Sequence, residues 1–367
     1  MRPTFWHNRR VLLTGHTGFK GAWLALWLRS MGAQVSGYAR RPETSPNLHD
    51  YIGEHPADAS DIGELSDIER LTDRMRVCAP EVVLHLAAQP LVRLSYDEPL
   101  STLETNVLGT AHLLEAVRRT DGGCRRAVVV VTTDKCYSNR EWEWGYRETD
   151  QLGGHDPYSA SKACAEVVTD SYRSAYFAPS RYAQHQTAIA TARAGNVLGG
   201  GDWSPDRLVP DALAALADAR PLAVRAPEAV RPWQHVLEPL HGYLMLAERL
   251  HEEGPVYGEA WNFGPEEADA RPVSWVLERL AAIWGAELRM TMPGEREKES
   301  SGSKHEAGML RLDCSKARSR LGWRPRWTLE QALAHTVRWE QARRGGAAMT
   351  DITLGQIRAY TGEEVLL

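Results

Sequence analysis

A tyrosine and a lysine four residues apart could form an acid–base pair. Tyr158 and Lys162 lie in the segment DPYSASK (156–162), at the start of a predicted helix. Residues four apart share one helical face, so the lysine ammonium can lie near the phenol oxygen and favour the phenolate. The spacing therefore predicts Tyr158 as a base, although such a pair is common by itself and depends on its surroundings.

A second polar group follows a predicted buried strand. The run RAVVVVTT (126–133) is rich in β-branched residues, and Thr133, Asp134 and Lys135 stand at its carboxyl end. Ligands of a parallel sheet bind at the carboxyl ends of its strands, so these side chains should meet Tyr158 there. A hydroxyl, a carboxyl and an amine beside a phenol can move protons to and from one substrate. The structural alternative is two strand threonines, a turn-capping aspartate and a solvent-exposed lysine.

Glycines three apart follow the first predicted strand. The loop TGHTGFKG (14–21) leads from the strand RRVLLT into a helix. Such a turn lets backbone N–H groups and the helix amino terminus approach a pyrophosphate. The spacing GxxGxxG predicts a dinucleotide site of the short-chain dehydrogenase/reductase type, in which Lys162 would also hold the nicotinamide ribose. The loop residues expected at the cofactor are Gly15, Thr17, Gly18, Phe19, Lys20 and Gly21.

The position that reads the adenine ribose departs from the usual pattern. An acidic residue there would accept the ribose hydroxyls, but the chain has GYARR (37–41) after its second strand. Arg40 meets a 2′-phosphate or lies in a solvated loop, so NAD is expected and NADP stays open. Asp61 and Ile62 are predicted to contact the adenine, the alternative being that Asp61 caps a helix over Leu65–Val77. The run EVVLHLA and the residue after it supply the remaining predicted cofactor residues, Leu86, Ala87 and Ala88.

These residues need a scaffold in which several strands end at one edge. Buried apolar runs in the first half of the chain alternate with helical patterns, without polar alternation in the strands. This order predicts an α/β fold, a doubly wound parallel sheet covered on both faces. The expected strands are RRVLLT, AQVSGY, EVVLHLA, RAVVVVTT and TAIATARA, and the expected helices pass through Trp23–Leu28, Ile68–Val77, Leu103–Val117 and Tyr158–Tyr176.

After Asn196 the strand–helix alternation is lost, Pro and Gly become frequent, and Trp recurs. We therefore expect two domains. An NAD-binding Rossmann domain would comprise residues 1–195 with a returning segment at about 231–262. A smaller mixed α/β substrate-binding domain would comprise residues 196–230 and 263–367. The polar stretch 295–308 is expected to be a linker or a substrate lid.

The overall composition argues against several partners. The 367 residues carry a net charge of −5 with acids and bases interspersed, which disfavours nucleic acid and membrane surfaces. No apolar run approaches the roughly 20 residues that span a bilayer, and no signal core precedes the first strand, so the protein is expected in the cytoplasm. The five cysteines are spread without CxxC pairs, so neither disulfides nor a metal site is expected.

Several motifs together resemble the extended short-chain dehydrogenase/reductases of the nucleotide-sugar dehydratase branch. They are TGHTGFKG (14–21), HLAAQPLVRLSY (85–96), NVLGT (106–110), TTDKCY (132–137), DPYSASK (156–162), ARAGNVLGGGDW (192–203), RPWQHV (231–236) and WNFGP (261–265). Within that branch, TGHTGFKG, TTDKCYSN and RPWQHVLEPL are especially similar to the CDP-glucose 4,6-dehydratases. Thymidine-linked relatives carry Thr-Asp-Glu where this chain has Thr133, Asp134 and Lys135, which makes Lys135 the best discriminator.

The resemblance implies a lyase that converts CDP-D-glucose to CDP-4-dehydro-6-deoxy-D-glucose. Tyr158 takes the C4 hydroxyl proton while hydride leaves C4 for the nicotinamide, and Thr133 bonds the same oxygen. Asp134 is the acid that helps the C6 hydroxyl leave. Lys135 stands where relatives carry the glutamate base for the C5 proton, and it acts only if a dry, cationic pocket depresses its pKa. Hydride then returns to C6, and no metal takes part.

The resemblance also implies the substrate contacts. Arg231 matches the arginine that relatives direct at the diphosphate, whose oxygens suit a guanidinium fork. Trp203 is interpreted as packing at least as readily as a nucleoside contact, and His235 as structural. The other expected substrate residues are Gln89, Arg93, Asn196 and Arg207.

Two alternative functions use the same residues. A nucleotide-sugar 4-epimerase, or a dehydratase for another nucleotide sugar, would share the Tyr158 and Lys162 pair. An epimerase needs no elimination acid, so Asp134 and Lys135 argue against it. A non-catalytic dinucleotide-binding protein would have no need of Tyr158 or Lys162, and both are present.

The resemblance finally implies an assembly and a pathway. Relatives associate through helices that correspond to the stretches near Pro99–Arg118 and Tyr158–Tyr176. We therefore expect a homodimer or a dimer of dimers. The product would supply a deoxysugar for lipopolysaccharide O-antigen or a related glycan.

Overall fold

A seven-stranded sheet forms the centre of the computed structural model, which describes residues 1–53, 59–120, 123–292 and 308–362. All of its neighbouring strands are parallel, in the order β11-β6-β5-β4-β1-β2-β3. The strands are β1 (Arg10–Thr14), β2 (Gln34–Ala39), β3 (Ala59–Ile62), β4 (Val82–His85), β5 (Arg126–Val131), β6 (Thr187–Ala194) and β11 (Ala260–Phe263). The strand order reverses between β1 and β4, which confirms the predicted doubly wound sheet.

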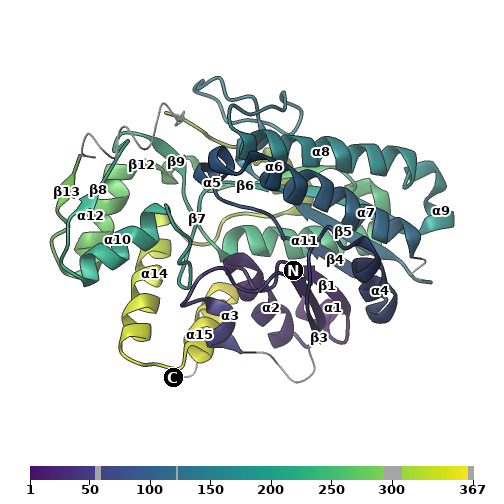
Figure 1. Ribbon diagram of the computed structural model, residues 1–367, viewed down its shortest axis with the longest axis horizontal. Helices are drawn as coiled ribbons and strands as arrows, with labels where there is room; N and C mark the ends of the chain where they lie inside the picture. Colours follow the sequence, from purple (N-terminus) through teal and green to yellow (C-terminus); the bar gives the residue numbers. More distant parts are fainter. Residues whose placement is uncertain (54–58, 121–122, 293–307, 363–367) are drawn as a thin grey trace.

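Helices cover both faces of this sheet (Figure 1). Successive strand residues point to opposite faces, so Val11 and Leu13 pack with α2 and α11, whereas Leu12 packs with α4 and α7. Both faces are therefore apolar, as the unbroken strand runs predict. The helices are α1 (Pro3–Trp6), α2 (Phe19–Ser30), α3 (Leu48–Ile52), α4 (Ile68–Cys78), α5 (Val92–Asp97), α6 (Pro99–Leu103), α7 (Gly109–Arg119), α8 (Pro157–Ala175), α9 (Tyr182–His185) and α11 (Leu237–Glu253).

The helix predicted over Leu103–Val117 is not continuous. A π-helical turn, η1 (Glu104–Leu108), joins α6 to α7. In this turn Asn106 is buried, where its Oδ1 accepts from the Gln89 N–H at 2.8 Å and its Nδ2 donates to Ser161 Oγ at 2.8 Å. The wider turn thus ties the loop after β4 to α8, a tertiary demand that a helical sequence pattern does not reveal.

A second group of elements packs around a core of its own beside the sheet (Figure 1). Leu213, Leu277 and Leu333 from three different helices meet in this core. The helices of this core are α10 (Leu208–Ala217), α12 (Val273–Trp284) and α14 (Leu329–Arg344), and α15 (Met349–Thr361) follows α14 back to the first core beside α2. The short strand pairs are β7 (Val197–Leu198) with β10 (Gln234–His235), β8 (Leu222–Ala223) with β13 (Met290–Thr291), and β9 (Val230–Pro232) with β12 (Ala270–Pro272).

Two predictions from the sequence, the polar linker or lid and the division into two domains, are not tested by the described residues. Of the stretch predicted to be a linker or lid, 295–308, only Gly308 lies within the described residues. The division into two domains with a returning segment stays a prediction. Within the described ranges, no helix combines the length and apolarity needed to cross a membrane.

Candidate active site

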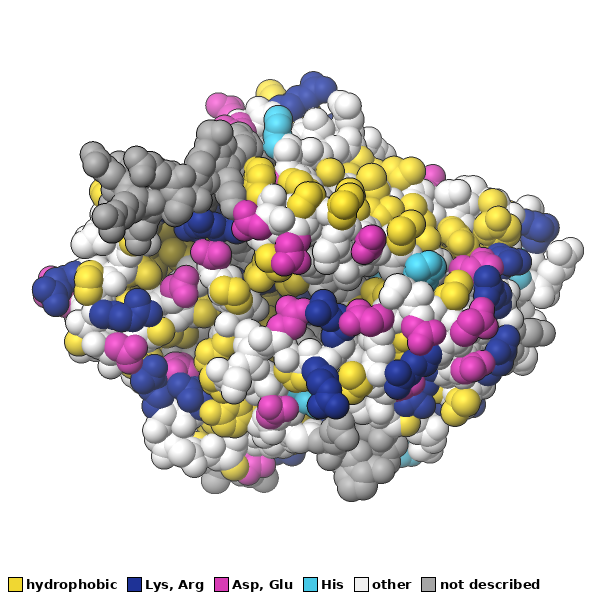
Figure 2. All heavy atoms as spheres, viewed as in Figure 1, with side chains coloured by type: hydrophobic (Ala, Val, Ile, Leu, Met, Phe, Trp, Pro, Cys, Tyr) yellow, Lys and Arg dark blue, Asp and Glu magenta, His cyan; other side chains and the backbone are white. Residues whose placement is uncertain are grey.

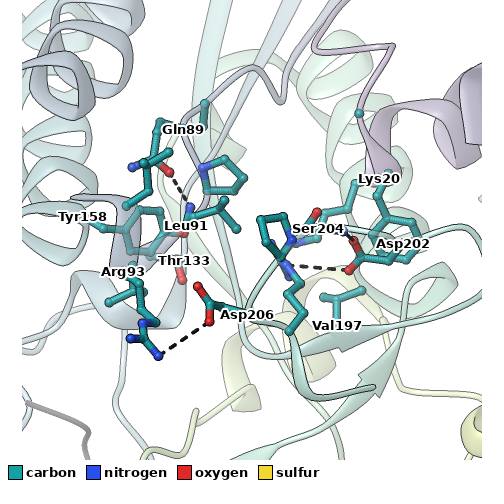
Figure 3. Close-up of a pocket in the computed structure, with 18 of the residues that line it drawn as sticks. Lys20, Gln89, Leu91, Arg93, Thr133, Tyr158, Val197, Asp202, Ser204 and Asp206 are labelled. Atoms are coloured by element: carbon teal, nitrogen blue, oxygen red, sulfur yellow. Dashed lines mark hydrogen bonds and ion pairs between the residues drawn. The ribbon is translucent and has the colours of Figure 1, made fainter. Parts of the chain in front are cut away.

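The carboxyl edge of the sheet opens into a cavity of about 1270 Å³, which both groups of elements line (Figure 3). A volume above the usual range for one small ligand suits two extended ones. The loops after β1, β4 and β5, the start of α8 and residues 196–199, 201–211 and 222–226 line it. Figure 3 shows Gln89, Thr133 and Tyr158 on one side and Val197, Asp202 and Ser204 on the other, with Lys20 beside Asp202. Every residue predicted for the site borders this cavity except Asp61 and Ile62.

The glycine loop after β1 depends on close backbone approach. Gly15 has φ +76°, and a Cβ there would lie 2.7 Å from the Ala87 nitrogen. A Cβ at Gly21 would lie 2.0 Å from the Gly15 oxygen. Only glycine fits either position, so the first turn of α2 borders the cavity, where its positive end favours a phosphate. Burial lowers the pKa of Lys20 in this turn to about 7, and Arg207 is the next cause.

Arg40, the residue that could bind the 2′-phosphate of NADP, forms ion pairs with two glutamates. The Arg40 guanidinium lies 3.2 Å from a Glu43 carboxylate oxygen and 3.3 Å from a Glu64 carboxylate oxygen. Thr17 Oγ1 donates to the Arg40 carbonyl at 2.8 Å, which joins the glycine loop to the end of β2. Two carboxylates beside Arg40 repel a 2′-phosphate, so this edge of the cavity suits a ribose without one.

Asp61 and Ile62 lie within β3 and do not border the cavity. The Asp61 carboxylate accepts from the Arg70 guanidinium, which holds it away. The helix-cap alternative for Asp61 is wrong, because the Asp67 side chain caps α4 by accepting from the Arg70 N–H at 3.1 Å. The adenine contact of Asp61 and Ile62 stays a prediction. The residues that border the cavity here are the next ones along the chain, Gly63, Glu64, Leu65 and Ser66.

Tyr158 and Lys162 are buried in the first turns of α8. Asp156 caps this helix by accepting from the Ser159 N–H at 2.8 Å. Lys162 Nζ donates to the Val131 carbonyl at 3.3 Å, and burial lowers the pKa of Lys162 to about 8. Burial raises the pKa of Tyr158 to about 12, although a hydrogen bond with the Thr133 side chain opposes the rise. The spacing from Lys162 predicted that the phenolate of Tyr158 would be favoured. In the protein alone, burial instead raises the Tyr158 pKa.

Asp134 stands in the 3₁₀ turn η2 (Asp134–Cys136), directly after β5, and is 2% exposed. Its Oδ1 accepts from Thr133 Oγ1 at 3.0 Å, while its buried Oδ2 has no hydrogen-bond partner among the described residues. Burial raises the pKa of Asp134, partly offset by Lys135. A carboxyl that is dry and unpartnered on one oxygen is suited to carry a proton for a substrate.

The predicted substrate residues differ in how they are held. Arg231 is 7% exposed and donates to the Val230 carbonyl at 3.0 Å. The Arg207 Nε lies 3.6 Å from an Asp202 oxygen. Figure 3 shows Arg93 facing Asp206, with 3.5 Å between guanidinium nitrogen and carboxylate oxygen.

Both residues predicted to offer a side-chain amide, Gln89 and Asn196, border the cavity. The Gln89 amide turns back into the protein, because its Nε2 donates to Thr102 Oγ1 at 2.8 Å and its Oε1 accepts from the Leu91 N–H. The backbone carbonyl of Asn196 accepts from the backbone N–H of Gln234 at 3.0 Å. Gln89 therefore positions the loop after β4 as well as bordering the cavity.

Gly195 and Arg225, which the sequence did not single out, also lie at the site, and the structure places the two residues left without a firm role, Trp203 and His235. A Cβ at Gly195 would lie 2.9 Å from Asp134 Oδ2, so glycine keeps space at the free oxygen. Trp203 borders the cavity and stacks on Tyr51, with ring centroids 5.8 Å apart. Arg225 borders it from a segment without regular periodicity. His235 does not line the cavity and is fully buried against Trp23, in agreement with its structural interpretation.

Comparison with known proteins places this arrangement in a family. Residues 12–336 match the family described as GDP-mannose 4,6 dehydratase. The chain belongs to this family. A curated family relative, the CDP-glucose 4,6-dehydratase of Salmonella typhimurium, is 48% identical over 97% of this chain and 97% of its own length, which confirms the resemblance seen in the motifs. The dTDP-glucose 4,6-dehydratase of Xanthomonas campestris is 28% identical over 89% of this chain and 92% of its own.

Solved structures share the family's fold. The dTDP-glucose 4,6-dehydratase of Bacillus anthracis in complex with NAD aligns with a TM-score of 0.74 and 22% identity, over 93% of this chain and 99% of that one. MoeE5 in complex with UDP-glucose and NAD aligns with a TM-score of 0.73 and 25% identity, over 91% and 99%. The parallel sheet and the helices around it are therefore those of a well-populated fold.

Proposed function

We propose that this protein is an NAD-dependent lyase that dehydrates CDP-D-glucose to CDP-4-dehydro-6-deoxy-D-glucose. The observation that carries the chemistry is the dry Asp134 carboxyl, with one unpartnered oxygen, next to the Thr133 and Tyr158 pair. An epimerase has no use for an acid at that position. The choice of nucleotide rests on the 48% identity to the Salmonella typhimurium CDP-glucose 4,6-dehydratase.

The first stage is oxidation at C4. Tyr158 accepts the proton of the C4 hydroxyl, and Thr133, which already bonds Tyr158, steadies the same oxygen. NAD, which the glycine loop and Lys162 would hold, would supply the hydride chemistry that links C4 to C6. The hydrogen bond with Thr133 and the positive charge of Arg207 oppose the burial that raises the Tyr158 pKa.

The second stage removes water across C5 and C6. Lys135 accepts the C5 proton, which the C4 ketone acidifies, and Asp134 gives its proton to the departing C6 hydroxyl. After the hydride reaches C6, Lys135 returns its proton to C5. Proton transfer from Tyr158 to Asp134 then restores both groups, so the sugar has lost one water and the protein is unchanged.

The cofactor and substrate take opposite ends of the cavity in this proposal. The glycine loop from Gly15 to Gly21, Leu86, Ala87, Ala88 and Arg40 would hold NAD. The acids beside Arg40 favour NAD over NADP. The nucleotide sugar lies toward Gln89, Arg93, Asn196, Arg207 and Arg231. Residues 1–195 with the returning segment 231–262 would form the cofactor domain, and the remainder the substrate domain.

The assembly is proposed from an exposed apolar face. Figure 2 shows hydrophobic side chains gathered over the region where Figure 1 places α6 and α8. Leu100 is 73% exposed, Leu108 52% and Val167 58%, so a second copy of the chain would cover costly surface here. We propose a homodimer through this face, working in the cytoplasm to supply a deoxysugar for O-antigen or a related glycan.

The test is incubation of the purified protein with NAD and, separately, CDP-glucose, dTDP-glucose, UDP-glucose and GDP-mannose, followed by mass spectrometry. Loss of one water from CDP-glucose alone is the expected result. Loss of water from another nucleotide sugar would correct the substrate and keep the reaction. Epimerised sugar without water loss, or no change in any sugar, would overturn the dehydratase function.

A further inference from the structure

A buried ion pair lies behind the catalytic side of the cavity. The Glu166 and Arg193 side chains are each 4% exposed, with 2.8 Å between Arg193 Nη2 and Glu166 Oε2. Glu166 follows Lys162 by one turn of α8, and Arg193 lies near the end of β6. Neither side chain borders the cavity. Because desolvating two charges costs as much as their attraction returns, such a pair is weak evidence of a purely stabilising role.

Glu166 gathers donors from the strands that carry the site. Thr132 Oγ1 donates to Glu166 Oε1, and Thr191 Oγ1 donates to Glu166 Oε2 at 2.7 Å. Thr132 directly precedes Thr133, so its hydrogen bond fixes the end of β5 just before the proposed catalytic residues. One carboxylate thus joins β5, β6 and α8 where their relative positions decide the distance from Thr133 to Tyr158.

Arg193 continues the network toward the segment after η2 and the edge strand β11. Its Nη1 donates to Tyr137 Oη at 2.8 Å and to the Glu148 carbonyl at 3.1 Å. Tyr137 Oη donates to Asn262 Oδ1 at 2.7 Å, and Asn262 Nδ2 donates to the Tyr146 carbonyl at 2.8 Å. The motif WNFGP, which has no role in the proposed reaction, therefore ends a chain of hydrogen bonds that begins at the catalytic strand.

Glu166 also acts on the charge of Lys162. Burial lowers the Lys162 pKa to about 8, and the Glu166 carboxylate opposes that fall. Three other titratable groups act with Lys162: Cys136 after β5, His85 at the end of β4 and Lys20 in α2. Burial raises the Cys136 pKa well above its ordinary value and lowers that of His85 to about 3, so both are neutral near pH 7. Glu166 is then the anion among these groups.

We propose that Glu166, held by Arg193, is a positioning residue for the dehydration. It fixes Thr132, and with it the catalytic end of β5, and it supplies the negative charge that keeps Lys162 protonated. This inference rests on the roles proposed above for Thr133, Tyr158 and Lys162. It gives the Arg193 to Asn262 chain a function, which is to hold that carboxylate in one place.

Two substitutions separate the hydrogen bond from the charge. Glu166→Gln keeps an acceptor for Thr132 but removes the charge, and it should lower kcat about tenfold with less than about a twofold change in KM for CDP-glucose. It should also move the basic limb of the kcat profile down by about one pH unit, because Lys162 loses its proton earlier. Thr132→Val keeps the charge, so it should lower kcat about threefold without moving that limb.

Glu248→Gln is the matched control. Glu248 is a buried carboxylate that accepts from the Trp6 Nε1–H and the Arg2 N–H, both at 2.8 Å, and it does not border the cavity. A merely structural role predicts a lower Tm for both Glu→Gln variants and an unmoved basic limb for both. That result, or an unchanged kcat in folded Glu166→Gln, would overturn the proposal.

Two further measurements keep the inference testable apart from the proposed function. If Glu166→Gln does not fold, Arg193→Lys takes its place, because it keeps the positive charge without the guanidinium fork. This variant should lower kcat with only a small change in KM. A normal kcat in both Arg193→Lys and Thr132→Val would overturn the positioning role. If the wild-type protein dehydrates no nucleotide sugar, the proposed function fails. NAD affinity, followed by tryptophan fluorescence against pH, still reports the Lys162 proton, and identical profiles for wild type and Glu166→Gln overturn the inference.

Discussion

The two sides of the cavity are built in different ways. Asp134 in η2 and Tyr158 in α8, both proposed for proton transfer, are 2% and 8% exposed, and Lys135 beside them in η2 is half-buried. Across the cavity, the Asp206 carboxylate is 49% exposed in a loop, 3.5 Å from an Arg93 nitrogen and 3.9 Å from an Arg225 nitrogen. Buried residues of regular elements hold the catalytic side, whereas the loop residues Asp206 and Arg225 are held by partly exposed ion pairs that also include Arg93 of α5.

This difference follows from what each side must do. Proton transfer requires donor and acceptor within hydrogen-bond reach, and burial shifts their pKa values in useful directions. Binding a flexible nucleotide sugar tolerates small movements, and exposed ion pairs re-form at little cost because water screens them. Substitutions on the catalytic side should therefore change kcat strongly, and substitutions on the substrate side should change KM weakly.

Removal of the proposed base gives the largest expected effect. Tyr158→Phe deletes the oxygen that accepts the C4 proton, so kcat should fall about a thousandfold while NAD affinity changes little. Tyr176→Phe, at the exposed C-terminal end of the same helix, is the control and should keep full activity. Steady-state kinetics with CDP-glucose measure both. Activity of Tyr158→Phe within tenfold of wild type would break the contrast between the two sides.

Asp134→Asn should stop the reaction part-way. The amide cannot give a proton to the departing C6 hydroxyl, so turnover should fall about a hundredfold while C4 oxidation still proceeds. Reduced nicotinamide should then accumulate on the enzyme and be visible in its absorbance spectrum after mixing with substrate. In wild type, burial raises the Asp134 pKa, so the acid form persists to higher pH and kcat declines as pH rises through that pKa. Loss of both stages together would assign Asp134 to oxidation instead.

Lys162→Met should stabilise the protein while it weakens catalysis. The Lys162 pKa is lowered from its unfolded value to about 8, so the unfolded chain binds its proton more tightly and burial of the charge costs stability below pH 8. Removing the charge should return roughly 1–3 kcal/mol at pH 7, less the lost bond to Val131. The gain should shrink as pH rises from about 8 toward the unfolded value.

Thermal unfolding across that pH range measures the effect. Lys316→Met is the control, because Lys316 forms an exposed-edge ion pair with Glu259 and its removal should not raise Tm. A lower Tm for Lys162→Met at pH 7 would mean that the Lys162 ammonium is fully compensated in the folded state. Burial of the charge on the catalytic side would then cost no more folding free energy than burial of the charges on the substrate side.

The same contrast explains what could be predicted from the sequence. Strands β1, β2, β4, β5 and β6 and the catalytic residues of α8 follow from short-range patterns, since a buried parallel strand is a continuous apolar run and a helix places residues four apart together. Gly195 and Arg225 could not be found that way, because their roles arise from chain segments that meet only in the folded protein. The ion pair of Asp61 with Arg70 could not be found from short-range patterns either, because Arg70 lies on the next helix.

Asp206→Asn should give the smallest effect and tests the substrate side directly. Loss of the carboxylate frees Arg93 and Arg225 for a diphosphate, so KM for CDP-glucose should fall by less than about fivefold, within the roughly 1 kcal/mol of an exposed ion pair. kcat should stay unchanged, and the difference from wild type should shrink in added salt. Asp218→Asn, on an exposed acid that does not border the cavity, should change neither constant. A large fall in kcat for Asp206→Asn would mean that this loop orders the reacting groups, and the two sides would then work as one unit.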